Sequence, residues 1–304
     1  MKLDYSVPGQ VSINMVDYVK SMLTGFAAHL PKSRATVASP WNENLFKVQK
    51  QSPALPQQQA ELFHTVTAQG LFLTKRARPD IAPAIAYLTT RVKAPNRDDW
   101  DKLIRMMRFL QQTQEDVLTL RADGSGDQKW HTDASFAVHP DFRSHTGATL
   151  TMGQGAITSI SRKQGMNTRS STEAEVVAAD EVVGPILWTR QFLEAQGYPV
   201  RKSILFQDNQ SAMLLETNGR TSAGKRSRHL NIRYFFVADQ QQQGRLHIEY
   251  CPTDQMIGDY MTKPLHGTKF NDFRRLIMNL PMSSAAQLMM AACVVDPGAG
   301  LDTG

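Results

Sequence analysis

The chain has little cysteine and no long apolar run. Its 304 residues include two cysteines, Cys251 and Cys293, too few for a disulfide framework or a cysteine-rich zinc site. We therefore expect an intracellular location, cytoplasmic or nuclear. The N-terminus turns polar at once, which predicts no signal peptide. The apolar run 285–295 is well short of the ~20 residues that span a bilayer, so we expect no membrane partner.

The charge balance is mildly positive. The net charge is +6 and the isoelectric point about 9.3. This excess is compatible with a polyanionic partner such as nucleic acid but does not require one. Hydrophobic residues make up 41% of the chain and charged residues 20%. A chain of this length and composition can bury a sizeable core and is expected to hold two units.

Residues 1–123 are predicted to be mainly helical after a short strand-like start. Apolar spacing indicates helices near 15–30, 62–74, 80–90 and 97–113, with a Pro- and Gln-rich loop at 52–59. The sequence ADGSGD at 122–127 lacks the ligand pattern of a calcium loop. We interpret it as a turn that joins two units.

From Lys129 onward the hydrophobic period is that of strands. Three strands are predicted at 129–137, 147–152 and 156–161. A helix at 171–195 and a strand at 203–207 follow, then helices at 209–216 and 229–243, a strand at 245–251 and a helix at 255–262. This order predicts an α/β fold with a mixed five-stranded sheet and helices on its faces. We expect it to occupy residues 124–280, with 281–304 as a disordered tail.

Four acidic motifs carry the candidate chemistry: HTDAS with Asp133, STEAE with Glu175, FQDNQSA with Asp208, and IGDYMTKPL with Asp259. Asp133 falls within the first strand, and Asp208 ends a strand, where open α/β sheets usually bind ligands. Carboxylates that share a site repel one another unless cations neutralise them. Oxygen ligands suit Mg²⁺ or Mn²⁺, and two such ions can support phosphodiester hydrolysis.

Each carboxylate also has a purely structural explanation. Residues 172–175 fit a capping box, in which Glu175 would only complete the helix start. Asp208 and Asn209 both suit a helix N-cap, and Asp259 alone would be a solvated helix residue. Asp133 is harder to explain in this way, because Asp is disfavoured in strands. The ordered set therefore favours a site more strongly than any single member does.

The residues around these motifs resemble the ribonuclease H domain of copia-type retrotransposon polyproteins. Residues 128 to about 280 follow that pattern in HTDASF, SSTEAEVVAADEV, DNQSAM and DQMIGDYMTKPL. The upstream TKRARPDIAPAIAYLT and WDKLIRMMRFLQQT resemble the end of the preceding reverse transcriptase region. The Tyr-x-Asp-Asp motif of that family's polymerase site is not in the sequence, and the nearest text is MVDY. The resemblance thus implies a polymerase-inactive reverse transcriptase remnant in 1–123 and a ribonuclease H-like domain in 124–280.

The resemblance implies a metal-dependent endoribonuclease that cuts the RNA strand of RNA–DNA hybrids, with other polyprotein segments as further partners. It assigns metal binding and catalysis to Asp133, Glu175, Asp208 and Asp259, with two Mg²⁺ ions or Mn²⁺ as cofactor. Ser135 stands where a second aspartate is common in the family. Two alternatives stay open: a non-catalytic relic that folds and binds nucleic acid, and an enzyme of the same fold that cuts DNA.

Basic residues near the motifs are candidates for phosphate contacts. Arg162 and Lys163 precede the long helix, and His229 lies in the family-like segment SRHLNIRYFF. Residues 217–238 contain no acidic residue and five basic ones, Arg220, Lys225, Arg226, Arg228 and Arg233. A phosphate-binding loop and a solvated loop explain these residues equally well. A packing or capping role for His229 is as plausible as substrate contact. A hybrid would be recognised by its shape and its 2′-hydroxyl groups.

Overall fold

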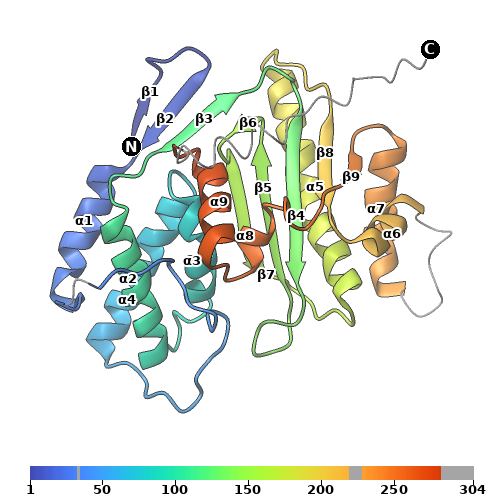
Figure 1. Cartoon of the computed structure of the whole chain (residues 1–304). Coiled ribbons are helices and arrows are strands. Elements are labelled where there is room, and N and C mark those ends of the chain that lie inside the picture. Colours follow the sequence, from blue (N-terminus) through green and yellow to red (C-terminus); the bar gives the residue numbers. More distant parts are fainter. Residues whose placement is uncertain (33–34, 219–227, 282–304) are drawn as a thin grey trace, which may run out of the picture.

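A mixed sheet stands at the centre of the molecule (Figure 1). The computed structural model describes residues 1–32, 35–218 and 228–281, with residues 218 and 228–234 described by their backbone only. The five-stranded sheet has the order β7 (Thr158–Lys163), β5 (His145–Thr151), β4 (Gln128–Ser135), β8 (Ser203–Gln207) and β9 (His247–Tyr250). The first three strands are antiparallel, whereas β8 runs parallel to β4 and β9 parallel to β8. The predicted fold class is confirmed.

The two faces of this sheet are covered by different helices. Trp130 and Ala134 of β4 pack with residues of α5 (Ser171–Ala195), which contacts α6 (Gln210–Asn218) and α7 (Arg228–Gln242). Successive side chains of a strand point to opposite faces. Asp133 therefore faces the other side, where α8 (Asp259–Thr262) and α9 (Gly267–Met278) lie (Figure 1).

The N-terminal half contains a second sheet as well as the predicted helices. Its four strands have the order β1 (Lys2–Asp4), β2 (Gln10–Asn14), β3 (Leu118–Ala122) and β6 (Gly153–Gln154). The helices are α1 (Val16–Phe26), α2 (Gln57–Thr74), α3 (Ala82–Thr89) and α4 (Arg97–Gln112), with single 3₁₀ turns η1 (Ala27–His29) and η2 (Pro79–Ile81). Because β6 comes from the second half of the chain, this sheet joins the two halves.

Several predicted boundaries were wrong. The predicted 52–59 loop ends at Pro56, because α2 begins at Gln57, directly after it. The first long helix ends at Phe26 and continues as a 3₁₀ turn, and the helix expected at 255–262 is the single turn α8. Helix α9 was not predicted, although its buried Phe270, Phe273 and Ile277 follow helical spacing. The predicted tail lies, except for Pro281, outside the described residues.

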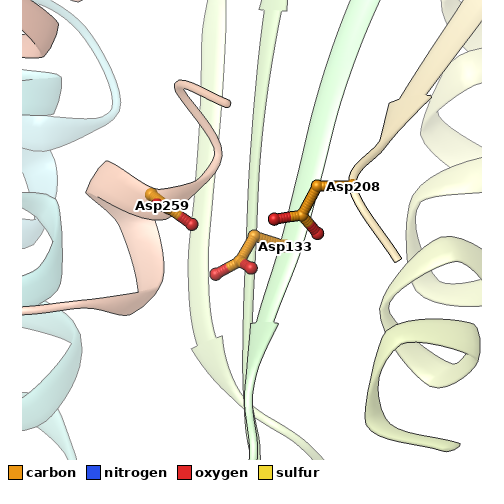
Figure 2. Close-up of side chains that lie close together, drawn as sticks. All are labelled: Asp133, Asp208 and Asp259. Atoms are coloured by element: carbon orange, nitrogen blue, oxygen red, sulfur yellow. The ribbon is translucent and has the colours of Figure 1, made fainter. Parts of the chain in front are cut away.

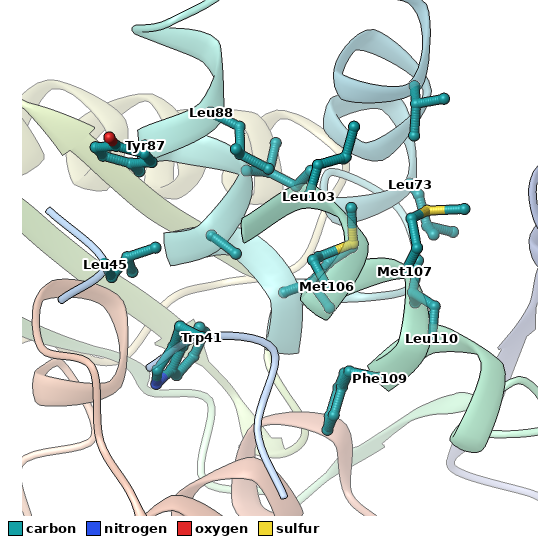
Figure 3. Packing of buried hydrophobic residues seen from close by; sticks show 14 of the residues in the cluster. Trp41, Leu45, Leu73, Tyr87, Leu88, Leu103, Met106, Met107, Phe109 and Leu110 are labelled. Atoms are coloured by element: carbon teal, nitrogen blue, oxygen red, sulfur yellow. The ribbon is translucent and has the colours of Figure 1, made fainter. Parts of the chain in front are cut away.

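The largest hydrophobic cluster draws on both halves of the chain. Buried residues of α1 to α4 pack together with Tyr260 of α8 and with Phe270 of α9, and Figure 3 shows part of this cluster. Trp41 lies between the two sets. Its ring centroid is 5.4 Å from that of Tyr260 and 5.5 Å from that of Phe270, and its Nε1 donates to the Leu265 carbonyl at 2.9 Å. The helix that carries Asp259 is thus held by N-terminal residues.

A buried ion cluster strengthens the same junction. Asp80 of η2 accepts hydrogen bonds from Arg78 Nε and from Arg274 Nε of α9, both at 2.9 Å. Burial alone would raise the pKa of Asp80, but the two guanidinium groups lower it to about 2. Arg274 also donates to Asp116. A buried carboxylate with such partners is costly to leave unpaired, so this cluster fixes α9 against η2.

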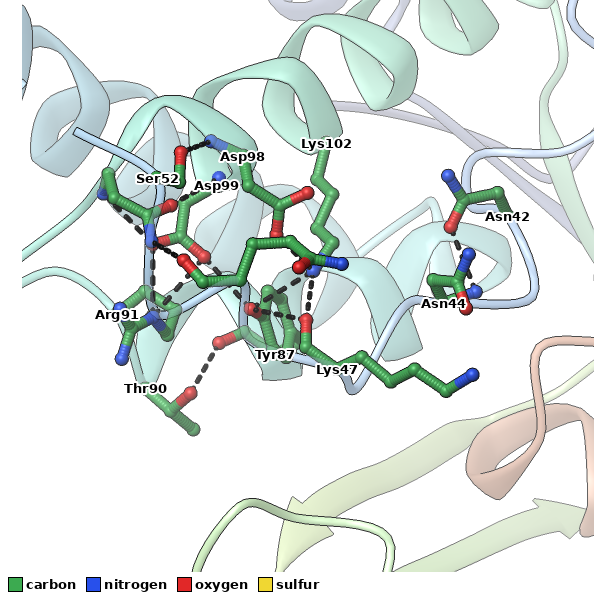
Figure 4. A network of polar contacts seen from close by, with 12 residues as sticks. Asn42, Asn44, Lys47, Ser52, Tyr87, Thr90, Arg91, Asp98, Asp99 and Lys102 are labelled. Atoms are coloured by element: carbon green, nitrogen blue, oxygen red, sulfur yellow. Dashed lines mark hydrogen bonds and ion pairs between the residues drawn. The ribbon is translucent and has the colours of Figure 1, made fainter. Parts of the chain in front are cut away.

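A polar network orders the loop before α2. Asp99, buried in the first turn of α4, accepts hydrogen bonds from Tyr87 Oη at 2.8 Å and Arg91 Nε at 3.0 Å (Figure 4). Asp99 and Asn96 form a capping box at the start of α4. Lys102 donates to the Lys47 carbonyl at 2.5 Å. Tyr87, Asp99 and Lys102 thus have hydrogen-bond partners in the buried network, and the loop is fixed against α3 and α4.

Candidate active site

Parallel pairing of two strands brings Asp133 and Asp208 side by side. His131 of β4 pairs with Phe206 of β8, so Asp133 is level with Asp208, which directly follows β8. Asp259, the first residue of α8, approaches from the face opposite α5. One carboxylate oxygen of each aspartate lies within 4.8 Å of those of the other two. The three side chains point toward one another (Figure 2).

Two glycines let α8 come close to the sheet. Gly147 of β5 pairs with Asp133, and a Cβ at Gly147 would lie 2.5 Å from Thr262 Cγ2 and 2.7 Å from Met261 Cβ. A Cβ at Gly258 would lie 3.0 Å from the Thr132 carbonyl carbon. Glycine within a strand often marks such a close approach of another backbone. Sequence reasoning did not identify either glycine as part of the site.

Glu175 is buried beside the aspartates but lies outside the group of three. Its residue is 5% exposed, and its Oε2 has no hydrogen-bond partner among the described residues. Burial raises the pKa of Glu175 well above its usual value, and the charges of Asp133 and Asp208 raise it further. The Ala134 backbone N–H opposes this rise. The second glutamate of the STEAE motif is thus a buried carboxyl group close to Asp133 and Asp208.

The helix-capping roles that were considered for Glu175 and Asp208 belong to neighbouring residues. Ser170 is the N-cap of α5 and accepts from the Glu173 backbone N–H at 3.1 Å, while Glu173 Oε2 accepts from the Arg169 backbone N–H at 2.7 Å. Asn209 Oδ1 accepts from the Ala212 backbone N–H at 3.0 Å and so caps α6. The capping explanation of Glu175 is therefore wrong. Asp259 is buried, so the explanation as a solvated helix residue is wrong as well.

Two lysines that sequence reasoning missed neutralise part of the acidic charge. Lys263 Nζ lies 3.1 Å from Asp133 Oδ1 and 2.5 Å from Asp259 Oδ1. Lys269 Nζ lies 2.7 Å from Asp259 Oδ2. The motif contains a signal for the contact between Lys263 and Asp259, because Lys263 follows Asp259 by four residues. Nothing local predicts the contact with Asp133, which is distant in sequence.

The hydroxyl groups and charges around Asp133 have opposing effects. Thr262 Oγ1 donates to Asp133 Oδ2, and Thr253 Oγ1 donates to Asp208 Oδ2 at 3.0 Å. Burial is the main cause that raises the pKa of Asp133 to about 6. Asp259 adds to the rise, whereas Lys263 and the Thr262 hydroxyl oppose it. This region therefore favours a cation or a proton next to Asp133.

The predicted nucleic-acid contacts fall into three groups. Arg162 Nε pairs with Glu181 at 3.0 Å, and Lys163 Nζ pairs with Asp141 at 2.6 Å. The backbone of α7 includes Arg228, His229 and Arg233, whose side chains lie outside the described structure. Arg220, Lys225 and Arg226 lie entirely outside the described residues. The nucleic-acid interface stays a prediction.

The chain is similar in sequence to several retrotransposon polyproteins. Over 267 residues, 86% of this chain, it is 27% identical to the retrovirus-related Pol polyprotein from transposon TNT 1-94 of Nicotiana tabacum. Over 202 residues, 66% of this chain, it is 29% identical to that from transposon RE2 of Arabidopsis thaliana. Over 194 residues it is 26% identical to the Ty1-DR5 Gag-Pol polyprotein of Saccharomyces cerevisiae. These matches span only 20%, 14% and 11% of the polyproteins.

Solved structures of ribonuclease H domains are similar at a low level. LC11-RNase H1 from compost aligns with a TM-score of 0.34 and 13% identity, over 45% of this chain and 93% of that one. The N-terminal RNase H domain of a Mycobacterium tuberculosis protein aligns with a TM-score of 0.32 and 13% identity, over 54% of this chain and 98% of that one. Similarity at this level carries no conclusion about the site.

Two further findings concern family models and membrane-spanning helices. No protein-family model matches the chain. In the part of the chain that the structure describes, no helix combines the length and the apolar character needed to cross a membrane. The sequence matches to the three polyproteins show that the chain is, over much of its length, a homologue of retrotransposon Pol polyproteins.

Proposed function

We propose that this chain is the ribonuclease H part of a retrotransposon polyprotein, a metal-dependent endoribonuclease that hydrolyses the RNA strand of RNA–DNA hybrids. The observation that carries the proposal is the convergence of Asp133, Asp208 and Asp259 at one place on the sheet. Its substrate, its polyprotein partners and an intracellular location, cytoplasmic or nuclear, are parts of the same proposal. So is the division into units at 1–123 and 124–280.

The residues of the site fit a hard divalent cation. All four carboxyl groups supply oxygen, the ligand atom that Mg²⁺ and Mn²⁺ prefer. Glu175 Oε2 is buried without a hydrogen-bond partner among the described residues, so a ligand atom is available beside Asp133 and Asp208. Divalent ions at such a site lower the pKa of bound water and stabilise charge on the attacking and leaving oxygens of a phosphodiester.

Each residue has a distinct role in this proposal. Asp133 and Asp208 would hold the two Mg²⁺ ions, and Asp259 would supply a further ligand from the α8 side. Glu175 would help to position one ion and the attacking water. Basic residues near 162–163 and in 220–233 contact backbone phosphates, which carry affinity but no sequence information. The hybrid is recognised by its shape and its 2′-hydroxyl groups.

One observation favours the non-catalytic alternative, a relic that folds and binds nucleic acid. Lys263 and Lys269 already neutralise Asp259, and Lys263 also contacts Asp133. An acidic cluster neutralised by lysines needs no metal to be stable. The two functions differ in whether a metal ion can replace a lysine at these carboxylates and whether a hybrid is then cut.

A cleavage assay separates the candidate functions. Labelled RNA–DNA hybrid, RNA duplex and DNA duplex are incubated with the purified chain in Mg²⁺ or in EDTA. The same assay is run on Asp208→Asn and on the control Asp101→Asn, which changes a carboxylate on the exposed side of α4. The proposal expects cleavage of the hybrid alone, lost in EDTA and in Asp208→Asn but kept in Asp101→Asn. Binding of the hybrid without cleavage would support the relic, and equal cutting of DNA duplex would support a DNA-cutting enzyme.

A further inference from the structure

Lys263 connects two carboxylates that come from distant parts of the chain. Its Nζ is 3.1 Å from Asp133 Oδ1 in the central strand and 2.5 Å from Asp259 Oδ1 in α8. The side chains of both aspartates are 2% exposed, whereas that of Lys263 is 37% exposed. The ammonium group thus sits at the boundary between the buried acidic site and solvent.

Lys269 contacts the same acidic site but is held differently. Its Nζ donates to Asp259 Oδ2 at 2.7 Å and also to the Thr253 carbonyl at 3.0 Å. It also lies 5.2 Å from the centroid of the Phe273 ring. Lys269 therefore has anchors other than the acidic site. The hydrogen bonds of the Lys263 ammonium group to described residues go only to Asp133 and Asp259.

We propose that Lys263 is the resident counter-ion of this site, which holds Asp133 and Asp259 together until a divalent cation binds and then moves into solvent. The inference rests on the proposed function in one respect, because it takes these two aspartates as metal ligands. Buried carboxylates without a counter-charge are strongly destabilising. Lys263 supplies that charge before a metal arrives.

The same contacts make Lys263 a competitor of the metal. The two oxygens that it contacts would also be metal ligands, and an ammonium group and a divalent cation at such short range repel each other. The side chain of lysine is a flexible four-carbon stem whose charged end favours water. Since Lys263 is already partly exposed, it can leave without unfolding α8. Lysine at this position therefore stabilises the metal-free site and lowers its affinity for metal.

The test compares Lys263→Met with Lys269→Met in the full chain. Thermal unfolding is followed in EDTA and in saturating Mn²⁺, and Mn²⁺ affinity is measured by calorimetric titration. We expect Lys263→Met to lower the Tm in EDTA, with little of that loss remaining in Mn²⁺. By linkage the variant then binds Mn²⁺ more tightly, by about tenfold or more. Lys269→Met is expected to lower the Tm by similar amounts under both conditions.

Two results would overturn the inference. The first is an equal loss of Tm in EDTA and Mn²⁺ for Lys263→Met, which means that Lys263 stays at the site when metal binds. The second is Mn²⁺ binding that is unchanged or weaker in Lys263→Met. Lys263→Met leaves the carboxylates of Asp133 and Asp259 without this counter-charge. If that variant does not fold, the double variant Asp133→Asn/Lys263→Met, in which Asp133 carries no charge, is compared with Asp133→Asn alone. The double variant should then bind Mn²⁺ more tightly than the single one, and equal or weaker binding overturns the inference.

Failure of the inference about Lys263 can be distinguished from failure of the proposed ribonuclease function. A chain that binds Mn²⁺ and behaves as expected in Lys263→Met but leaves hybrid uncut overturns the proposed function only. A chain that cuts hybrid but shows no gain in Mn²⁺ affinity in Lys263→Met overturns this inference only. Absence of Mn²⁺ binding in both the wild-type chain and Lys263→Met overturns both.

Discussion

Substituting alanine for Gly147 tests whether Asp259 is placed by the close approach of α8 to the sheet. The added Cβ would lie 2.5 Å from Thr262 Cγ2, 2.7 Å from Met261 Cβ and 3.0 Å from the Gly258 carbonyl oxygen. Ordinary van der Waals contacts begin near 3.4 Å. To restore them, α8 must move away from β5 by about 1 Å, the difference between ordinary and imposed contact distances. Asp259 moves with α8, because it is the first residue of that helix.

The magnitudes follow from this displacement. Overpacking of this kind costs roughly 1–3 kcal/mol, and replacing glycine in a strand recovers about 0.5–1 kcal/mol. We expect a net loss of about 1–2 kcal/mol in the free energy of unfolding, a fall of a few degrees in Tm. Metal sites tolerate ligand displacements of only about 0.2 Å. Mn²⁺ affinity should therefore fall by about tenfold or more.

Gly184→Ala provides the matched control. Gly184 lies within α5, and no described atom outside its own helix neighbourhood comes within 4 Å of the added Cβ. Alanine there should leave Mn²⁺ affinity unchanged and raise stability by up to about 1 kcal/mol. Both variants are measured by thermal unfolding in EDTA and by Mn²⁺ titration. Wild-type Mn²⁺ affinity in Gly147→Ala would refute the placement of Asp259 by close contact.

Two further predictions concern stability. Tyr260→Phe removes the buried hydrogen bond from Tyr260 Oη to the Asp80 carbonyl, at 2.9 Å, and should lower the free energy of unfolding by about 1–2 kcal/mol in urea titration. Burial raises the pKa of Glu216 to about 8, so the folded chain retains a proton there that the unfolded chain loses near its ordinary value of 4.5. Stability from this group is complete below pH 4.5 and is lost as the pH rises to 8, by up to about 5 kcal/mol. Glu216→Gln should lack that loss in urea titrations between these pH values, and a parallel pH profile in the two proteins would contradict the assignment.

Sequence patterns predicted the site best where a residue's neighbours determine its position. Asp133 lies in a strand and Asp208 at a strand end, and parallel pairing of those strands makes them adjacent. These relations depend on chain segments of a few residues, and their periodicity is visible in the sequence.

Contacts between distant segments could not be predicted in this way. Strand β3 has five residues, and its pairing with β2 and β6 depends on the whole N-terminal half. The contact between Lys263 and Asp133 spans 130 positions. Gly147 could be identified as important only once α8 was known to pack over it. Such features arise from tertiary packing, which overrides local preference.

The position of Asp259 shows why the N-terminal half matters to the site. Helix α8 is a single turn and could not be stable alone. Tyr260 hydrogen-bonds to Asp80 and packs against Trp41, while Arg274 of α9 pairs with Asp80. Every one of these contacts joins the segment after β9 to residues before 123. Residues 1–123 therefore supply the surface on which Asp259 is held, although none of the four candidate carboxylates lies among them.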